Sequence, residues 1–196
     1  MITIGITGIM GSGKSTLARL LSKDYPVLST DKINYDLQQK GEKGYLAIVK
    51  EYSSSILNEN QEIDRAKLAS IVFSDQEAKN RLETIMHPLV KEKMDCQLAN
   101  LQQEKFCFVE VPLLFEKGWE EYFDYTVTIS GDVVEIKKRL QKERNLSLQQ
   151  IEERMSQQFS QEEKEKKADF IIKNDGSMEE LEKKVVQLIE QLNRLD

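Results

Sequence analysis

The sequence has few of the residues that build disulfide frameworks and metal clusters. Its 196 residues include two cysteines and a single histidine, and Cys96 and Cys107 lie eleven positions apart without CxxC spacing. This pattern favours free, partly buried thiols in a reducing cytoplasm over a disulfide or a metal site. No apolar run approaches the ~20 residues of a membrane-spanning helix, and the N-terminus lacks a signal-peptide pattern. We therefore expect a cytoplasmic protein with no membrane partner.

Positive charge is also scarce. Against 34 acidic residues the chain has 28 lysines and arginines, which gives a formal net charge of -6. This balance disfavours a general nucleic-acid surface, although a local group of cations can still bind an anionic ligand. With only three prolines and nine glycines, 39% hydrophobic and 32% charged residues, the composition is that of a folded, helix-rich chain. Its length allows one substantial core and a small inserted subdomain.

Short β-branched or aromatic runs alternate with longer helical patterns, which is typical of an α/β fold with a parallel sheet covered by helices. The central runs are continuously apolar, as expected for strands buried on both faces. The five predicted strands are Ile2–Thr7, Pro26–Ser29, Phe106–Val111, Tyr125–Ser130 and Asp169–Lys173. The clearest helical pattern begins at Met178, with Ser177 as its N-cap. We expect a five-stranded parallel sheet.

Two long stretches do not fit a simple strand-helix-strand pattern. About 75 residues separate the second and third predicted strands, far more than a crossover requires. Within them, Glu77–Ile85 predicts one helix and Pro88 opens another, so this stretch indicates an inserted helical subdomain. The polar stretch Lys138–Lys167 has few apolar anchors. It is either a solvated helix pair or a mobile lid.

A phosphate-binding loop is the strongest motif in the chain. The run from Gly8 to Ser15, Gly-Ile-Met-Gly-Ser-Gly-Lys-Ser, matches GxxxxGK[ST] between a predicted strand and a predicted helix. Its glycines leave backbone N–H groups facing an anion, and the helix N-terminus adds about half a positive charge. Lys14 is placed to bridge the β- and γ-phosphates, and the Ser15 hydroxyl is a magnesium ligand. We expect a site for ATP with Mg²⁺, built from Gly8, Gly11, Ser12, Gly13, Lys14, Ser15 and Thr16.

Carboxylates at two strand ends are candidates for catalysis. Asp31 follows the second predicted strand, where it would activate a substrate hydroxyl or act as the N-cap of the next helix. Glu110 and Glu116 flank the Val-Pro-Leu-Leu-Phe run after the third strand. Glu110 is the better placed of the two to hold a magnesium-bound water.

Three arginines, Arg139, Arg144 and Arg154, lie in or beside the polar stretch. A single arginine there would be an ordinary surface residue, but three beside a phosphate site favour a role for at least one in stabilising the transferred phosphoryl group. His87, the only histidine, stands before Pro88, where it could cap a helix or contact a substrate.

The chain resembles the dephospho-coenzyme A kinase family along almost its whole length. Besides the phosphate loop, three segments carry the resemblance: His87-Pro88-Leu89, the run Glu110–Glu116, and the final Ala168-Asp169 with Asn174 and Gly176. Asp31 falls where the family has its catalytic aspartate. Ile63-Asp64-Arg65 is similar to part of the family's helical substrate domain, and Arg139, Arg144 and Gln158 fit its lid.

The resemblance implies a reaction and a division of labour. MgATP phosphorylates the ribose 3′-hydroxyl of dephospho-coenzyme A, the last step of coenzyme A synthesis. Asp31, Lys14 and Arg139 would be catalytic, Arg144 and Asn174 would join the ATP site, and Arg65, His87 and Leu113 would bind the acceptor. The implied architecture is a P-loop kinase core (1–30, 105–137 and 168–196), a helical acceptor domain (31–104) and a lid (138–167).

Three positions depart from the family pattern. Ile9 stands where the family has a second glycine, Ser29 where it often has an additional aspartate, and Glu110 where many members have aspartate. The alternative function is another P-loop kinase acting on a nucleotide or nucleoside. A guanine-reading switch is disfavoured, because the chain has no Asn-Lys-x-Asp segment. The oligomeric state stays open between a monomer and a small homo-oligomer.

Overall fold

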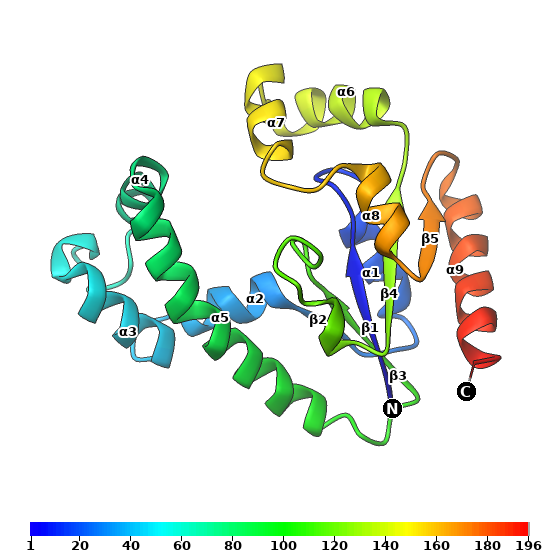
Figure 1. Ribbon diagram of the computed structural model, residues 1–196, viewed down its shortest axis with the longest axis horizontal. Helices are drawn as coiled ribbons and strands as arrows, with labels where there is room; N and C mark the ends of the chain where they lie inside the picture. Colours follow the sequence, from blue (N-terminus) through cyan, green and yellow to red (C-terminus); the bar gives the residue numbers. More distant parts are fainter. Residues whose placement is uncertain (196) are drawn as a thin grey trace. The chain divides into compact units, whose positions relative to one another are not determined.

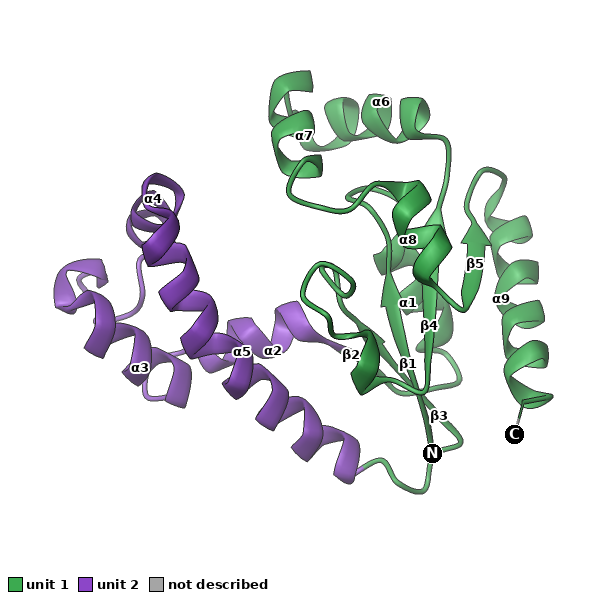
Figure 2. Cartoon of the chain, in the orientation of Figure 1, with its two compact units in different colours: residues 1–28, 101–196 green, residues 29–100 purple. Residues whose placement is uncertain are grey.

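A computed structural model of the chain describes residues 1–195 and divides into two compact units (Figure 2). Unit 1 contains residues 1–28 and those from 101 onward, and unit 2 contains residues 29–100. Unit 1 is therefore built from two separate lengths of chain, with unit 2 inserted between its second and third strands.

The sheet of unit 1 has five strands in the order β2-β3-β1-β4-β5. β1 pairs in parallel with β3 and with β4, and β4 pairs in parallel with β5. The strands are β1 (Ile2–Thr7), β2 (Val27–Ser29), β3 (Phe106–Glu110), β4 (Tyr125–Ser130) and β5 (Phe170–Lys173). The predicted α/β fold with a five-stranded parallel sheet is confirmed, and each strand lies within one residue of its predicted bounds.

Alternating side chains of β1 face two different layers. Ile4 and Ile6 are fully buried in the main core, together with Leu17 of α1 (Lys14–Leu21) and Leu188 of α9 (Met178–Asn193). Gly5 points to the opposite face, where an added Cβ would lie 2.5 Å from Leu114 Cδ1. The bare backbone at position 5 therefore lets the segment after β3 pack directly on the central strand.

Two strand starts on the sheet are held by the same arrangement. Thr3 donates its backbone N–H and its hydroxyl to Asp124 Oδ2 at 2.7 and 2.8 Å. Thr126, on the next strand, donates the same two groups to Asp169 Oδ2 at 2.8 and 2.7 Å. Each aspartate directly precedes a strand, so these bonds fix where β4 and β5 begin. Asp169, one of the residues that carry the family resemblance, therefore has a structural partner in Thr126.

Three helices of unit 1 begin with well-formed caps. Ser147, Ser160 and Ser177 each form a capping box, in which the serine accepts from the third helical N–H and the third side chain accepts in return. The predicted N-cap at Ser177 is thus confirmed. The helices are η2 (Glu120–Tyr122), α6 (Val133–Arg144), α7 (Leu148–Met155) and α8 (Gln161–Lys167).

The polar stretch 138–167 is mostly helical. It holds the end of α6 and two further helices, and both Ile151 and Lys164 in it are fully buried. The burial of Lys164 could not be expected from its residue type, because lysine is almost never fully buried unless it is paired.

Unit 2 is helical, and α5 (Gln76–Ala99) is its longest element, with α2, α3 and α4 packed on it (Figure 1). The prediction that Pro88 opens a new helix is wrong, because Pro88 lies inside α5. An interior proline costs a helix ~3 kcal/mol, and burial of Met86, Val90 and Met94 on both sides of it offsets that cost. The other elements are α2 (Thr30–Leu37), α3 (Lys43–Tyr52), η1 (Ser54–Ile56) and α4 (Arg65–Ser74).

Candidate functional site

The phosphate loop joins β1 to α1 at the carboxyl edge of the sheet. Gly13 caps α1 with φ 109° and ψ 16°, a left-handed conformation that glycine adopts without steric cost. At Gly8 an added Cβ would collide with the backbone oxygen of Ile129 on β4. Glycine is thus required at both ends of the loop, once for conformation and once for close approach of two strands.

Lys14 and the two residues after it form the start of α1. The Lys14 ammonium donates to the carbonyls of Gly8 at 2.8 Å and Ile9 at 3.0 Å, which closes the loop around the side chain. Ser15 is exposed and Thr16 half-buried in the first turn of the helix. The start of α1 therefore presents N–H groups, an ammonium and a hydroxyl together, the donor set that a polyphosphate requires.

Asn174 supports the phosphate loop by hydrogen bonds. Its side-chain Nδ2 donates to the backbone oxygen of Ser12 at 2.8 Å, and its backbone N–H donates to Ser130 at 2.6 Å. A Cβ at Gly13 would collide with that same amide group. Asn174 follows β5 directly, so the residue after an edge strand of the sheet supports the phosphate loop.

Glu110 ends β3 and is paired in register with Ile6, one residue before the last position of β1. Its side chain is half-buried. The structure therefore brings this carboxylate to the same sheet edge as the phosphate loop. Leu113, three residues further on, is half-buried in the turn that follows.

The arginines of the polar stretch are placed differently from one another. Arg139 in α6 donates to the backbone oxygen of Gly11 in the phosphate loop. Arg144 is the last residue of α6, and Arg154 lies in the last turn of α7; both are exposed. A second bond joins the same regions, since the Gln158 side chain accepts from the Met10 N–H at 2.8 Å.

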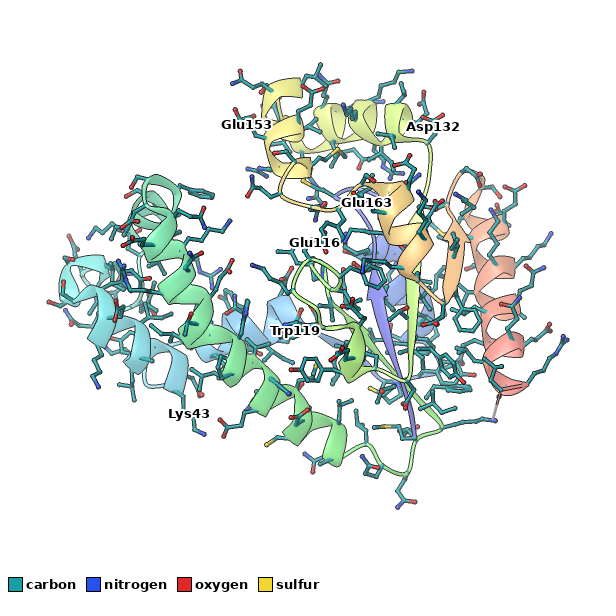
Figure 3. All side chains as sticks on the ribbon, in the orientation of Figure 1. Lys43, Glu116, Trp119, Asp132, Glu153 and Glu163 are labelled. Atoms are coloured by element: carbon teal, nitrogen blue, oxygen red, sulfur yellow. The ribbon has the colours of Figure 1, made fainter. Side chains whose placement is uncertain are left out.

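A buried ion pair behind the loop was not predicted. Lys164 of α8 is fully buried, and its ammonium lies 2.8 Å from Glu116. It also donates to the hydroxyl of Thr7 at 3.3 Å and to the Pro112 carbonyl at 3.2 Å. Figure 3 labels Glu116 on the segment after β3 and Glu163 on α8, beside Lys164 in the chain.

The pair shifts the titration of Lys164 and engages Glu116. Burial lowers the pKa of Lys164, and the Glu116 carboxylate opposes that change. Glu116 also accepts from the Phe159 N–H at 2.8 Å. Glu116, the weaker magnesium candidate, is therefore occupied by a lysine and a backbone donor. Only one member of the pair could have been noticed from the sequence, because Glu116 ends an apolar run.

Asp31 lies in the first turn of α2, within unit 2, and its residue is exposed. The alternative that Asp31 caps this helix is wrong, because the N-cap is Ser29, whose hydroxyl accepts from the Lys32 N–H. A serine is among the best N-caps, so Ser29 has a local structural function of its own. The Asp31 carboxylate is not used as the helix cap.

Two further acceptor-site candidates belong to unit 2. Arg65 begins α4, and its guanidinium lies 4.0 Å from the ring centroid of Tyr35. Because Asp31 and Tyr35 are four residues apart on α2, they share one face of that helix, and Arg65 is held beside it. His87 is half-buried in the interior of α5 and does not cap a helix.

Ile9 of the phosphate loop packs against residues outside the loop. Its side chain is buried, with 5% exposed, and packs with residues of α6 and α7.

Within residues 1–195, no three histidine, cysteine or acidic side chains gather into a metal-binding group, and no helix is long and apolar enough to cross a membrane. The two cysteines are free, Cys96 exposed and Cys107 buried.

Comparison with known proteins gives one consistent result. A family model described as Dephospho-CoA kinase matches residues 2–180. A dephospho-CoA kinase of Aquifex aeolicus is 37% identical over 195 residues, covering 99% of this chain and 99% of the relative. A crystal structure from Thermus thermophilus is 35% identical with a TM-score of 0.85, covering 97% of each chain. The dephospho-CoA kinase structure from Campylobacter jejuni is 33% identical with a TM-score of 0.73, covering 98% of this chain and 97% of that one.

Proposed function

The chain belongs to the dephospho-CoA kinase family, and we propose that it transfers the γ-phosphoryl group of ATP to the ribose 3′-hydroxyl of dephospho-coenzyme A. The products are coenzyme A and ADP, so the reaction is the last step of coenzyme A biosynthesis. The observation that carries this proposal is the closed phosphate loop, with Lys14 and the N-terminus of α1, in a chain that matches the family from residue 2 to residue 180.

The donor half of the reaction belongs to unit 1. The phosphate loop binds the β- and γ-phosphates through its shape and its backbone N–H groups, which come from Gly8, Gly11, Ser12, Gly13 and Thr16. Lys14 exchanges loop carbonyls for phosphate oxygens, because both are acceptors for the same ammonium. Asn174 keeps the loop in place through Ser12. Arg139 and Arg144, on residues 138–167 acting as a lid, neutralise charge on the transferred group.

The residues present fit a magnesium ion bound with ATP. Mg²⁺ prefers oxygen ligands, retains several waters, and in such sites is held by one or two protein groups plus phosphates. The hydroxyl of the exposed Ser15 would be one direct ligand, and Glu110 at the same sheet edge would hold a bound water. When bound, the ion neutralises charge on the β- and γ-phosphates.

The acceptor half belongs to the inserted helices, residues 31–104. Asp31 accepts the proton of the ribose hydroxyl, as an exposed carboxylate two residues after β2 whose helix is already capped by Ser29. Arg65, held on Tyr35, is suited to an anionic group of the acceptor. His87 and Leu113 complete the proposed acceptor contacts.

The direct test is product formation. Purified protein with ATP, MgCl₂ and dephospho-coenzyme A is expected to yield coenzyme A and ADP in equal amounts, measured by mass spectrometry. Adenosine, AMP and other nucleosides, tested in parallel, are expected to react far more slowly. Lys14→Ala is expected to abolish turnover. If another nucleoside or nucleotide were phosphorylated faster than dephospho-coenzyme A, the protein would instead be a kinase of that acceptor.

A further inference from the structure

A second hydrophobic cluster lies outside the main core of unit 1. It consists of buried residues from the phosphate loop, α6 and α7: Ile9, Ile136, Leu140 and Ile151, each with 5% or less of its surface exposed. Met10 packs against its edge. In Figure 1, α6 and α7 lie at the end of unit 1 toward which β1 points. The phosphate loop thus supplies a core residue to two helices that it does not belong to.

The side of α6 that faces the loop is defined by two residues one turn apart. Ile136 and Leu140 are four positions apart and therefore project from the same face. A Cβ added to Gly11 would lie 3.0 Å from side-chain atoms of both. The backbone of the phosphate loop is therefore in close contact with α6, and Ile9 fills the space beside that contact.

Arg139 is next to Leu140 on this helix, and its guanidinium donates to the Gly11 carbonyl. A carbonyl oxygen and a phosphate oxygen are both acceptors for a guanidinium, so the group that bonds to Gly11 is also suited to a phosphate. The reach of Arg139 is set by the packing of Leu140 and Ile136 against Ile9. A change in that packing moves the guanidinium relative to the phosphates.

The apolar cluster is a main attachment of the two helices to the loop among the described residues. Apart from the cluster and its edge, α6 and α7 are mostly charged or glutamine residues. A polar contact, from the Met10 N–H to the Gln158 side chain just after α7, adds to the bond of Arg139. Truncating Ile9 removes the loop's buried member from a cluster of four. The other three side chains then lose their dispersion contacts with it.

We propose that Ile9 is a positioning residue for Arg139: its side chain seats α6 on the phosphate loop so that the arginine is held at the transferred phosphoryl group. This inference rests on the proposed function only in assigning Arg139 to the phosphates. A core residue that merely stabilises the fold would lower the melting temperature without depending on the arginine. The two roles therefore differ in how Ile9 and Arg139 variants combine.

A double-mutant cycle separates these roles. Ile9→Ala, Arg139→Ala and the double variant are compared with the wild type in kcat, KM for ATP and melting temperature, at a temperature where all are folded. We expect Ile9→Ala to lower kcat/KM for ATP by about tenfold or more and Ile9→Val to stay within about threefold. The double variant should be no slower than Arg139→Ala alone, because there is no arginine left to misplace.

The matched control is Val134→Ala, an apolar truncation on the same helix at a side chain that is 61% exposed. It is expected to keep wild-type kinetics. Independent losses that multiply in the double variant, or full activity of Ile9→Ala, would overturn the inference.

The same cycle is measured on the affinity for MgATP by calorimetry, which needs no acceptor. Absence of turnover with dephospho-coenzyme A would count against the proposed function, whereas additive effects on MgATP affinity would count against the positioning role of Ile9.

Discussion

At the scale of single residues, Ser29 and Asp31 both lie at the start of α2. Ser29 is the N-cap and accepts from the Lys32 N–H, whereas Asp31 lies in the first turn of the helix. The positive end of the helix dipole attracts negative charge there. Asp31, which we propose as the base, is therefore not needed as the cap.

Asp31→Asn is expected to bind MgATP as the wild type does and to lose about 10²- to 10⁴-fold in kcat, because an amide cannot accept the hydroxyl proton. Steady-state kinetics with calorimetric MgATP affinity checks this outcome. Asp36→Asn is the matched control: Asp36 lies on the same helix in an exposed ion pair with Lys32, and its loss should leave kcat unchanged. Equal turnover of Asp31→Asn and wild type would remove Asp31 as the base.

How far the site was predictable depends on how its residues are spaced. Lys14 and Ser15 lie in one contiguous motif whose geometry is local, so the sequence was sufficient to expect a phosphate loop. The bond from Lys164 to Glu116 spans 48 positions, and the neighbours of Lys164 in the sequence are charged residues. Nothing local marks that lysine as buried, because only the packing of α8 removes it from water.

At the scale of elements, the same contrast separates strands from helices. Continuous apolar runs predicted the strands nearly to the residue, since burial on both faces constrains every position. The break at Pro88 was wrong, because a local rule about proline was outweighed by packing of three helices along α5. The packing of α6 on Ile9 could not be predicted from the sequence either, because it joins a loop to a helix far along the chain.

The attachment of α8 provides a stability prediction. Lys164→Met leaves the Glu116 carboxylate buried and without its ammonium, and we expect unfolding free energy to fall by about 3–5 kcal/mol. Urea denaturation measures it. Lys167→Met, on the same helix with a side chain 47% exposed and 3.7 Å from Glu120, should cost less than about 1 kcal/mol.

A second substitution tests the cause of that loss. Adding Glu116→Gln to Lys164→Met removes the uncompensated charge and leaves an oxygen to accept from Phe159, so part of the lost stability should return. If Lys164→Met were as mild as Lys167→Met, the buried pair would not be what holds α8.

At the scale of the whole molecule, stability in alkali depends on a thiol in the central sheet. Burial raises the pKa of Cys107 from 9.0 to about 11, with the Glu104 charge adding to the effect. Between these two values the unfolded chain releases the thiol proton and the folded chain retains it. The folded state then binds more protons, so stability falls as pH rises through this window.

A difference of about two pKa units corresponds to at most roughly 2.7 kcal/mol. We expect the wild type to lose up to this amount between pH 9 and pH 11 relative to Cys107→Ala, in urea denaturation at matched ionic strength. Cys96→Ala removes the exposed thiol and should keep the wild-type slope. Parallel curves for wild type and Cys107→Ala would contradict the prediction.

The amide of Asn174 reaches back across 162 positions to support Ser12, and this separation has a consequence for how the protein is made. The ribosome makes the phosphate loop 162 positions before it makes this support. A growing chain therefore carries the loop without the Asn174 amide until that residue has been added and has folded back onto Ser12.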